Sequence, residues 1–133
     1  MRRLLLPMLL LSAAAWGGSL DDCMRSAGTM PEVGGCLQQR HAQAESRLAA
    51  TEARVAREMA ELDQITAGRY AAARSHRQAR QAFARYRERQ CRWVAASYAS
   101  GNGAEQARLA CQTDLDEQRL QALLAHSAQE TSP

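Results

Sequence analysis

Residues 37–66 read LQQRHAQAESRLAATEARVAREMAELDQIT, and apolar or small side chains recur in this stretch at the spacing of an α-helix. The recurring positions are Ala44, Leu48, Val55, Met59, Leu62 and Ile65. Three of them, Leu48, Val55 and Leu62, are seven residues apart, which is the repeat of a long helix that packs along a neighbour. We therefore predict a long helix over about residues 37–66, ended by Gly68.

Two further helical runs follow this stretch, and almost nothing in the chain indicates a strand. The run over about residues 69–100 places one set of side chains on a common side: Ala79, Phe83, Tyr86, Trp93 and Ser97. After the turn signal SGNG at 100–103, a third run over about residues 104–125 carries Ala107, Cys111, Leu115, Ala122 and Leu123. We predict an all-α fold, an antiparallel bundle of three main helices with a disulfide-tied N-terminal segment, and expect Tyr86 and Trp93 in its core.

The first residues have the pattern of a secretory signal peptide. Arg2 and Arg3 precede a short apolar run, and Ala13 and Ala15 supply the small residues that a signal peptidase needs. We expect residues 1–19 to hold this signal, with the cut between Ala15 and Ser19. The 133-residue chain then leaves one helical domain over residues 20–126 and a flexible tail over 127–133. The apolar run is too short for a comfortable membrane span, so we expect a periplasmic or secreted protein without a transmembrane segment.

Four cysteines, Cys23, Cys36, Cys91 and Cys111, all follow the predicted signal peptide. An even number in a small exported domain indicates two disulfides. Zinc binding is the competing interpretation, but no two of these cysteines have the close spacing of a zinc site. We expect no metal and no cofactor.

Helix geometry predicts which cysteines pair. Cys91 lies eleven residues before Asn102 and Cys111 nine after it, so their heights in a hairpin differ by only about 3 Å. Counted in the same way from Gly68, the heights of Cys36 and Cys91 in a hairpin differ by about 13 Å, which is too far for a disulfide. We predict Cys91–Cys111 and, by elimination, Cys23–Cys36 across a short loop that holds Pro31, Gly34 and Gly35.

The charge of the chain is concentrated in one segment. All 17 basic residues are arginines, against 14 acids, so the chain without Arg2 and Arg3 is nearly neutral. Residues 69–92, however, contain eight arginines and a single acid, Glu88. Near neutrality and few aromatic residues disfavour nucleic acid as a partner. We predict a solvated helix face, including Arg74, Arg85, Arg89 and Arg92, whose arginines meet glutamates of neighbouring helices; binding of anionic envelope polymers is the alternative.

No arrangement of residues predicts catalysis, and we do not expect an enzyme. Arg87, Glu88 and Arg119 are the best charged candidates, and we expect them to form a structural ion pair between helices. The turn at 100–103 and its flanks are the best candidate for partner contact, because loops on rigid scaffolds often carry binding groups. The residues concerned are Tyr98, Asn102 and Glu105.

Three cysteine-containing motifs resemble those of a known family. Residues 23–36 read C-x(5)-T-x-x-E-x-x-x-C, and later come YRExxC at 86–91 and CxxxLxxxR at 111–119. Together they resemble the lysozyme-inhibitor LprI-like family of small exported bacterial proteins, over nearly the whole chain after the signal. Five positions depart from the pattern of that family: Gly34, Arg80, Phe83, Glu88 and Asp116.

The resemblance implies a helical exported protein that binds and inhibits a lysozyme. The alternative is a non-enzymatic protein-binding or structural module of the cell envelope, without inhibitory activity. The partner is accordingly a lysozyme or another envelope protein.

Overall fold

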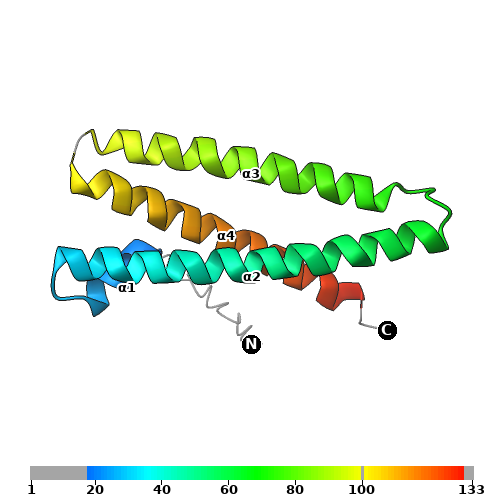
Figure 1. Ribbon diagram of the computed structural model, residues 1–133, viewed down its shortest axis with the longest axis horizontal. Coiled ribbons are helices and arrows are strands. Elements are labelled where there is room, and N and C mark those ends of the chain that lie inside the picture. Colours follow the sequence, from blue (N-terminus) through cyan, green and yellow to red (C-terminus); the bar gives the residue numbers. More distant parts are fainter. Residues whose placement is uncertain (1–17, 100, 131–133) are drawn as a thin grey trace, which may run out of the picture.

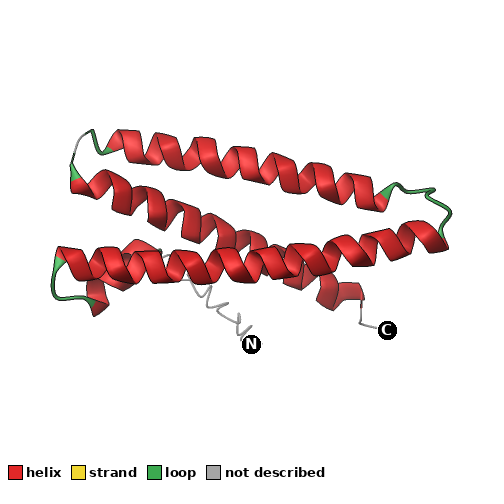
Figure 2. Ribbon diagram, in the orientation of Figure 1, coloured by secondary structure: helices red, strands yellow, loops and turns green. Residues whose placement is uncertain are grey.

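Four α-helices joined by short turns make up the part of the chain that the computed structural model describes, residues 18–99 and 101–130 (Figures 1 and 2). The helices are α1 (Ser19–Ser26), α2 (Met30–Ile65), α3 (Ala72–Ser97) and α4 (Asn102–Glu130). The three long helices run antiparallel to their chain neighbours, and α1 packs against α2 and α4. The all-α bundle predicted from the sequence is confirmed. Residues 1–17, on which most of the predicted signal peptide falls, lie outside the described residues.

Helix α2 begins at Met30, seven residues before the predicted start. Thr29 and Glu32 form a capping box: Thr29 Oγ1 accepts from the Glu32 amide at 3.4 Å, and Glu32 Oε2 accepts from the Thr29 amide at 3.0 Å. Pro31 lies in the first turn, where its missing N–H costs nothing. The expected loop at Pro31, Gly34 and Gly35 is therefore wrong, since these residues belong to the helix.

The turn between α2 and α3 is held by a side chain of α2. Asp63 accepts hydrogen bonds from the amides of Ala72 and Ala73 at 2.8 and 3.0 Å, which satisfies two free donors at the start of α3. Gly68 adopts φ +71°, a conformation that L-residues with a Cβ rarely adopt. The predicted turn at Gly68 is confirmed, and α3 begins at Ala72, three residues later than predicted.

Both predicted disulfides are present. Cys23–Cys36 joins α1 to α2 with a Cα–Cα distance of 5.8 Å, and Cys91–Cys111 joins α3 to α4 at 5.5 Å. The first lies in a hydrophobic cluster that also contains Val33, Leu37, Leu109 and Ala110. A second cluster, further along α2 and α4, consists of Leu48, Val55, Leu120 and Leu123 with Met59 and Phe83 at its edge.

Helix α3 contributes little to this core. Cys91 is the one fully buried residue among its described positions. Tyr86 is 53% exposed and Trp93 is 65% exposed, so the prediction that both are core residues is wrong. Both lie about 80–100° around the helix from the direction in which His76, Phe83 and Arg87 point. The inward face of α3 is therefore mixed, with Phe83 beside His76 and Arg87, and the apolar pattern predicted it correctly for Phe83 but not for Tyr86 and Trp93.

The C-terminal end of α2 is also less buried than its heptad repeat predicts. Leu62 is 37% exposed and Ile65 is 83% exposed, although both continue the apolar repeat. Val55, one repeat earlier, is buried against α4. The packed part of the bundle therefore runs from the disulfide end to the middle of α2.

Candidate functional site

Two clusters of charged side chains, one around Glu52 and one around Asp116, lie in the middle of the bundle, and each joins its three long helices. We call the two clusters together the ion-pair network, which consists of Glu45 and Glu52 on α2, His76 and Arg87 on α3, and Asp116 and Arg119 on α4. Helical spacing brings these residues together, since Glu45 and Glu52 are two turns apart on one face of α2.

Glu52 is the centre of one half of the ion-pair network and is 2% exposed. His76 Nε2 lies 2.7 Å from Glu52 Oε2, and Arg119 Nε donates to Glu52 Oε1 at 2.9 Å. The Arg119 guanidinium also lies over the Phe83 ring, 5.7 Å from its centroid. Each carboxylate oxygen of Glu52 therefore has a partner on a different helix.

Asp116 is the centre of the other half and is also 2% exposed. Arg87 Nη2 donates to Asp116 Oδ2 at 2.8 Å and to Glu45 Oε1 at 3.1 Å. Burial raises the pKa of the Asp116 carboxyl, and the neighbouring Arg87 charge acts in the opposite direction. One arginine of α3 thus links an acid of α2 to an acid of α4.

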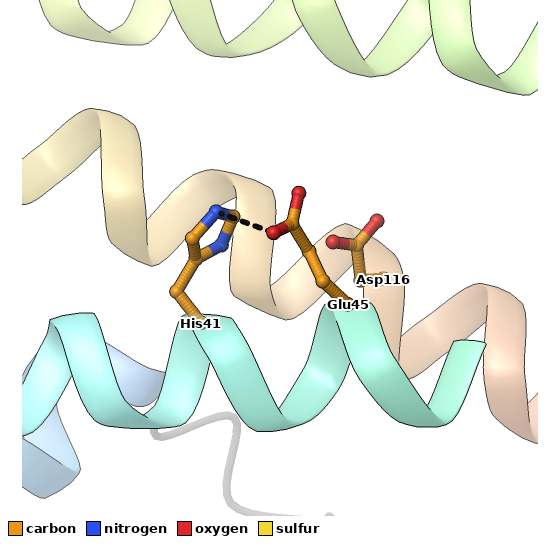
Figure 3. Close-up of side chains that lie close together, drawn as sticks. All are labelled: His41, Glu45 and Asp116. Carbon is orange, nitrogen blue, oxygen red and sulfur yellow. Dashed lines mark ion pairs between the residues drawn. The ribbon is translucent and has the colours of Figure 1, made fainter. Parts of the chain in front are cut away.

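His41, Glu45 and Asp116 place potential metal-ligand atoms within 4.8 Å of one another (Figure 3). His41 Nε2 lies 3.5 Å from Glu45 Oε2. Arg87, however, already donates to both carboxylates, so the positive charge in this cluster is a guanidinium. The residues fit an arginine-centred ion pair better than a cation site.

A groove of about 580 Å³ between α2 and α3 opens onto the ion-pair network. The small side chains Ala42, Ser46 and Ala49 of α2 form one wall, and Phe83 and Ala84 of α3 lie opposite. Glu45, Glu52, Arg87 and Asp116 contribute polar atoms to it. The groove is open and carries both signs of charge, a composition that selects no single ligand class.

Two of the three predicted ion-pair residues form ion pairs between helices, each with a different acid. Arg87 and Arg119 each bind a buried acid, but Glu88 pairs with Arg92 on its own helix at 3.0 Å. The expected pairing of Glu88 with Arg119 is therefore wrong. Glu88 is one residue, or about 100°, beyond Arg87 around the helix, and its side chain is 56% exposed.

The acids that bind these arginines were missed by sequence reasoning. Glu52 lies between Leu48 and Val55 on the face that packs in the core, where a charged residue is almost never fully buried without a partner. Asp116 precedes Arg119 by three residues, so the two share a face of α4. The signal available in the sequence for a buried ion pair was Glu52, a charged residue within an apolar heptad repeat.

The predicted partner-contact residues flank the turn between α3 and α4. Tyr98 is 50% exposed, and its ring lies against Gly103 at the start of α4. Glu105 is exposed and accepts hydrogen bonds from Arg108 at 2.5 and 3.0 Å. These hydrogen bonds lower the pKa of the Glu105 carboxyl. The side chain of Asn102 lies outside the described residues.

Most arginines of α3 do not contact glutamates of neighbouring helices. Among the described residues, Arg87 makes such contacts, and Arg92 pairs within its own helix. Arg74, Arg85 and Arg89 are exposed and have no ion pair within that part of the chain. The prediction that this face is solvated is correct, but the prediction that its arginines reach neighbouring glutamates is wrong.

Comparisons with known proteins assign the chain to a family. No curated protein and no solved structure matches it. In the part of the chain that the structure describes, no helix is both long and apolar enough to cross a membrane. The family model described as lysozyme inhibitor LprI matches residues 21–123, which include all four cysteines and the ion-pair network. The two disulfides and this family fit an extracellular or periplasmic protein. The chain belongs to the lysozyme inhibitor LprI family.

Proposed function

We propose that this protein is a non-enzymatic inhibitor that binds a lysozyme through the turn between α3 and α4. The observation that carries the proposal is the family match over residues 21–123. The turn is the candidate contact because its flanking side chains are exposed and the two helices that it joins are braced. A braced surface binds at lower cost, since each flexible side chain that binding immobilises costs about 0.5–1.5 kcal/mol.

Several contacts support the bracing of this turn. Cys91–Cys111 joins the two helices ten residues before and ten residues after Gly101. Gln106 Nε2 donates to the Met30 carbonyl at 3.3 Å, which ties the start of α4 to the start of α2. Figure 1 shows that α1 and the start of α2 lie at this same end of the bundle.

Three side chains beside the turn have the chemistry of a protein contact. Tyr98 is a half-exposed aromatic beside Gly103, and tyrosine is enriched among residues that dominate binding energies. Glu105 and Arg108 present an ordered pair of opposite charges one turn into α4. Such a pair fixes the orientation of a partner more than it adds affinity.

The test is a cell-wall clearing assay with the mature protein titrated against several types of lysozyme. Tyr98→Ala raises the inhibition constant about tenfold, because truncation of an aromatic anchor commonly costs more than 1 kcal/mol. Tyr70→Ala, an exposed tyrosine in the turn at the other end of α3, is the matched control and leaves inhibition unchanged. Both variants keep the circular-dichroism spectrum of the parent.

Two outcomes would contradict the proposal. If no lysozyme is slowed at micromolar excess, the protein is better described as a binding or structural module of the cell envelope. If inhibition occurs but Tyr70→Ala weakens it as much as Tyr98→Ala does, the turn between α3 and α4 is not the contact.

A further inference from the structure

The outer side of α3 carries an array of arginines that the fold does not use. Helix α3 contains seven arginines and one acid, Glu88. Four of the arginines, Arg74, Arg85, Arg89 and Arg92, point within an arc of about 60° and extend over about 27 Å of helix. We call these four residues the arginine face.

The arginine face is open to a partner. Within the described residues Arg74, Arg85 and Arg89 make no ion pair, and Arg92 contacts only Glu88 with both side chains more than half exposed. Like charges at i,i+3 and i,i+4, as in Arg85, Arg89 and Arg92, destabilise an isolated helix. A row of anionic groups bound along α3 relieves this repulsion.

Two exposed aromatic rings line one edge of the arginine face. Tyr86 is three residues before Arg89 and Trp93 is four residues after it, so Arg89 lies between the two rings along the helix. They are 53% and 65% exposed and do not belong to the core. A large exposed aromatic residue offers a flat apolar surface on which the C–H face of a sugar ring can pack.

We propose that the arginine face, with Tyr86 and Trp93, binds an acidic polysaccharide, a linear glycan that carries carboxylates on its sugars. The guanidinium groups pair with carboxylates, an arrangement for which arginine geometry is well suited. The two rings pack against sugars between the charged positions. This surface lies along α3, whereas the proposed lysozyme contact lies at the end of the bundle, so each proposal can fail without the other.

Acidic polysaccharide is favoured over nucleic acid by the disulfides. Two disulfides fit an extracellular or periplasmic compartment. Two rings on one edge of the face also give few stacking positions for a series of bases. Nucleic acid is nevertheless included in the test as an outcome against the proposal.

Trp93 provides a direct readout of binding. The chain contains two tryptophans, so in a Trp16→Phe background the fluorescence of Trp93 reports on the arginine face alone. We expect polygalacturonate to change this fluorescence in a saturable way at low salt, and added salt to weaken the binding because the contacts are exposed. Dextran, a neutral glycan, gives no change.

A pair of charge-matched variants tests the location. Arg85→Gln/Arg89→Gln weakens binding roughly tenfold, about a factor of three for each exposed contact. Arg47→Gln/Arg57→Gln removes the same charge from exposed arginines of α2 and leaves the affinity unchanged. Equal weakening in both variants would show a general charge effect and overturn the proposal.

Two further results would also overturn it. Absence of binding at low salt excludes a polysaccharide site on α3. Tighter binding of single-stranded oligothymidylate than of polygalacturonate would assign the arginine face to nucleic acid instead.

Discussion

Removal of the Arg119 charge tests whether the ion-pair network holds the bundle together. In Arg119→Met, Glu52 keeps His76 as its partner on Oε2 but loses the donor on Oε1. The methionine still packs against Phe83, so the change isolates the charge from most of the side-chain packing. The perturbation therefore leaves a carboxylate that is 2% exposed with half of its hydrogen bonds.

The magnitude follows from burial. Breaking a buried ion pair by removing one partner costs about 3–5 kcal/mol. The Arg119 side chain is 21% exposed and His76 remains, so we expect a loss of about 2–3 kcal/mol in the free energy of unfolding. Arg92→Met is the matched control, because its pair with Glu88 is exposed and contributes about 0–1 kcal/mol.

Urea unfolding followed by far-UV circular dichroism measures both variants. A second comparison, Arg119→Met in a Glu52→Gln background, completes a double-mutant cycle. Because glutamine carries no charge to leave unpaired, the arginine matters less there, and we expect a coupling energy of about 1–2 kcal/mol. If Arg119→Met costs no more than Arg92→Met, the ion-pair network does not stabilise the fold and the reasoning fails.

Three further predictions concern the N-terminal part of the chain. Thr29→Ala removes the capping box of α2 and lowers the unfolding free energy by about 1 kcal/mol in urea; no loss would contradict the cap. The hydrogen bond from Arg40 holds the pKa of Asp22 below its usual value, so ionised Asp22 stabilises the fold. This contribution is lost as the pH falls through the folded-state pKa of Asp22. Asp22→Asn therefore flattens the loss of stability below about pH 4 in urea titrations at a series of pH values, whereas an unchanged slope would count against the pair. We predict that signal-peptide cleavage leaves Ser19 in the mature protein, because its buried amide donates to Asp114 at 2.9 Å. Mass spectrometry should find the first residue of the mature protein at or before Ser19, and a later start would contradict this.

The disulfide pairing could be predicted because it depends on constants of the helix. Rise per residue is nearly invariant, so counting from the turn near Asn102 brings Cys91 and Cys111 to one height. The observed Cα–Cα distance of 5.5 Å agrees with that count. Turn positions are also well marked, because Gly68 and Gly101 adopt positive φ angles that favour glycine.

The inward face of α3 could be predicted only in part from hydrophobic periodicity. Periodicity arguments assume that buried positions are apolar. In α3 the inward positions include His76 and Arg87, and their partners Glu52 and Asp116 are on other helices. The sequence of α3 alone therefore does not mark its inward charges, and the one signal elsewhere is Glu52 at a core position of α2.

The arginines of this protein fall into two groups with separable roles. Arg87 and Arg119 bind acids that are 2% exposed, and loss of either leaves a buried carboxylate without its arginine. Arg85 and Arg89 are exposed, and their replacement changes the surface potential without disturbing the packing. Variants of the first group should therefore lower stability at any salt concentration, while variants of the second should leave stability the same or slightly higher and weaken binding that depends on salt. Stability and salt dependence together distinguish an arginine that holds the bundle from one that faces a partner.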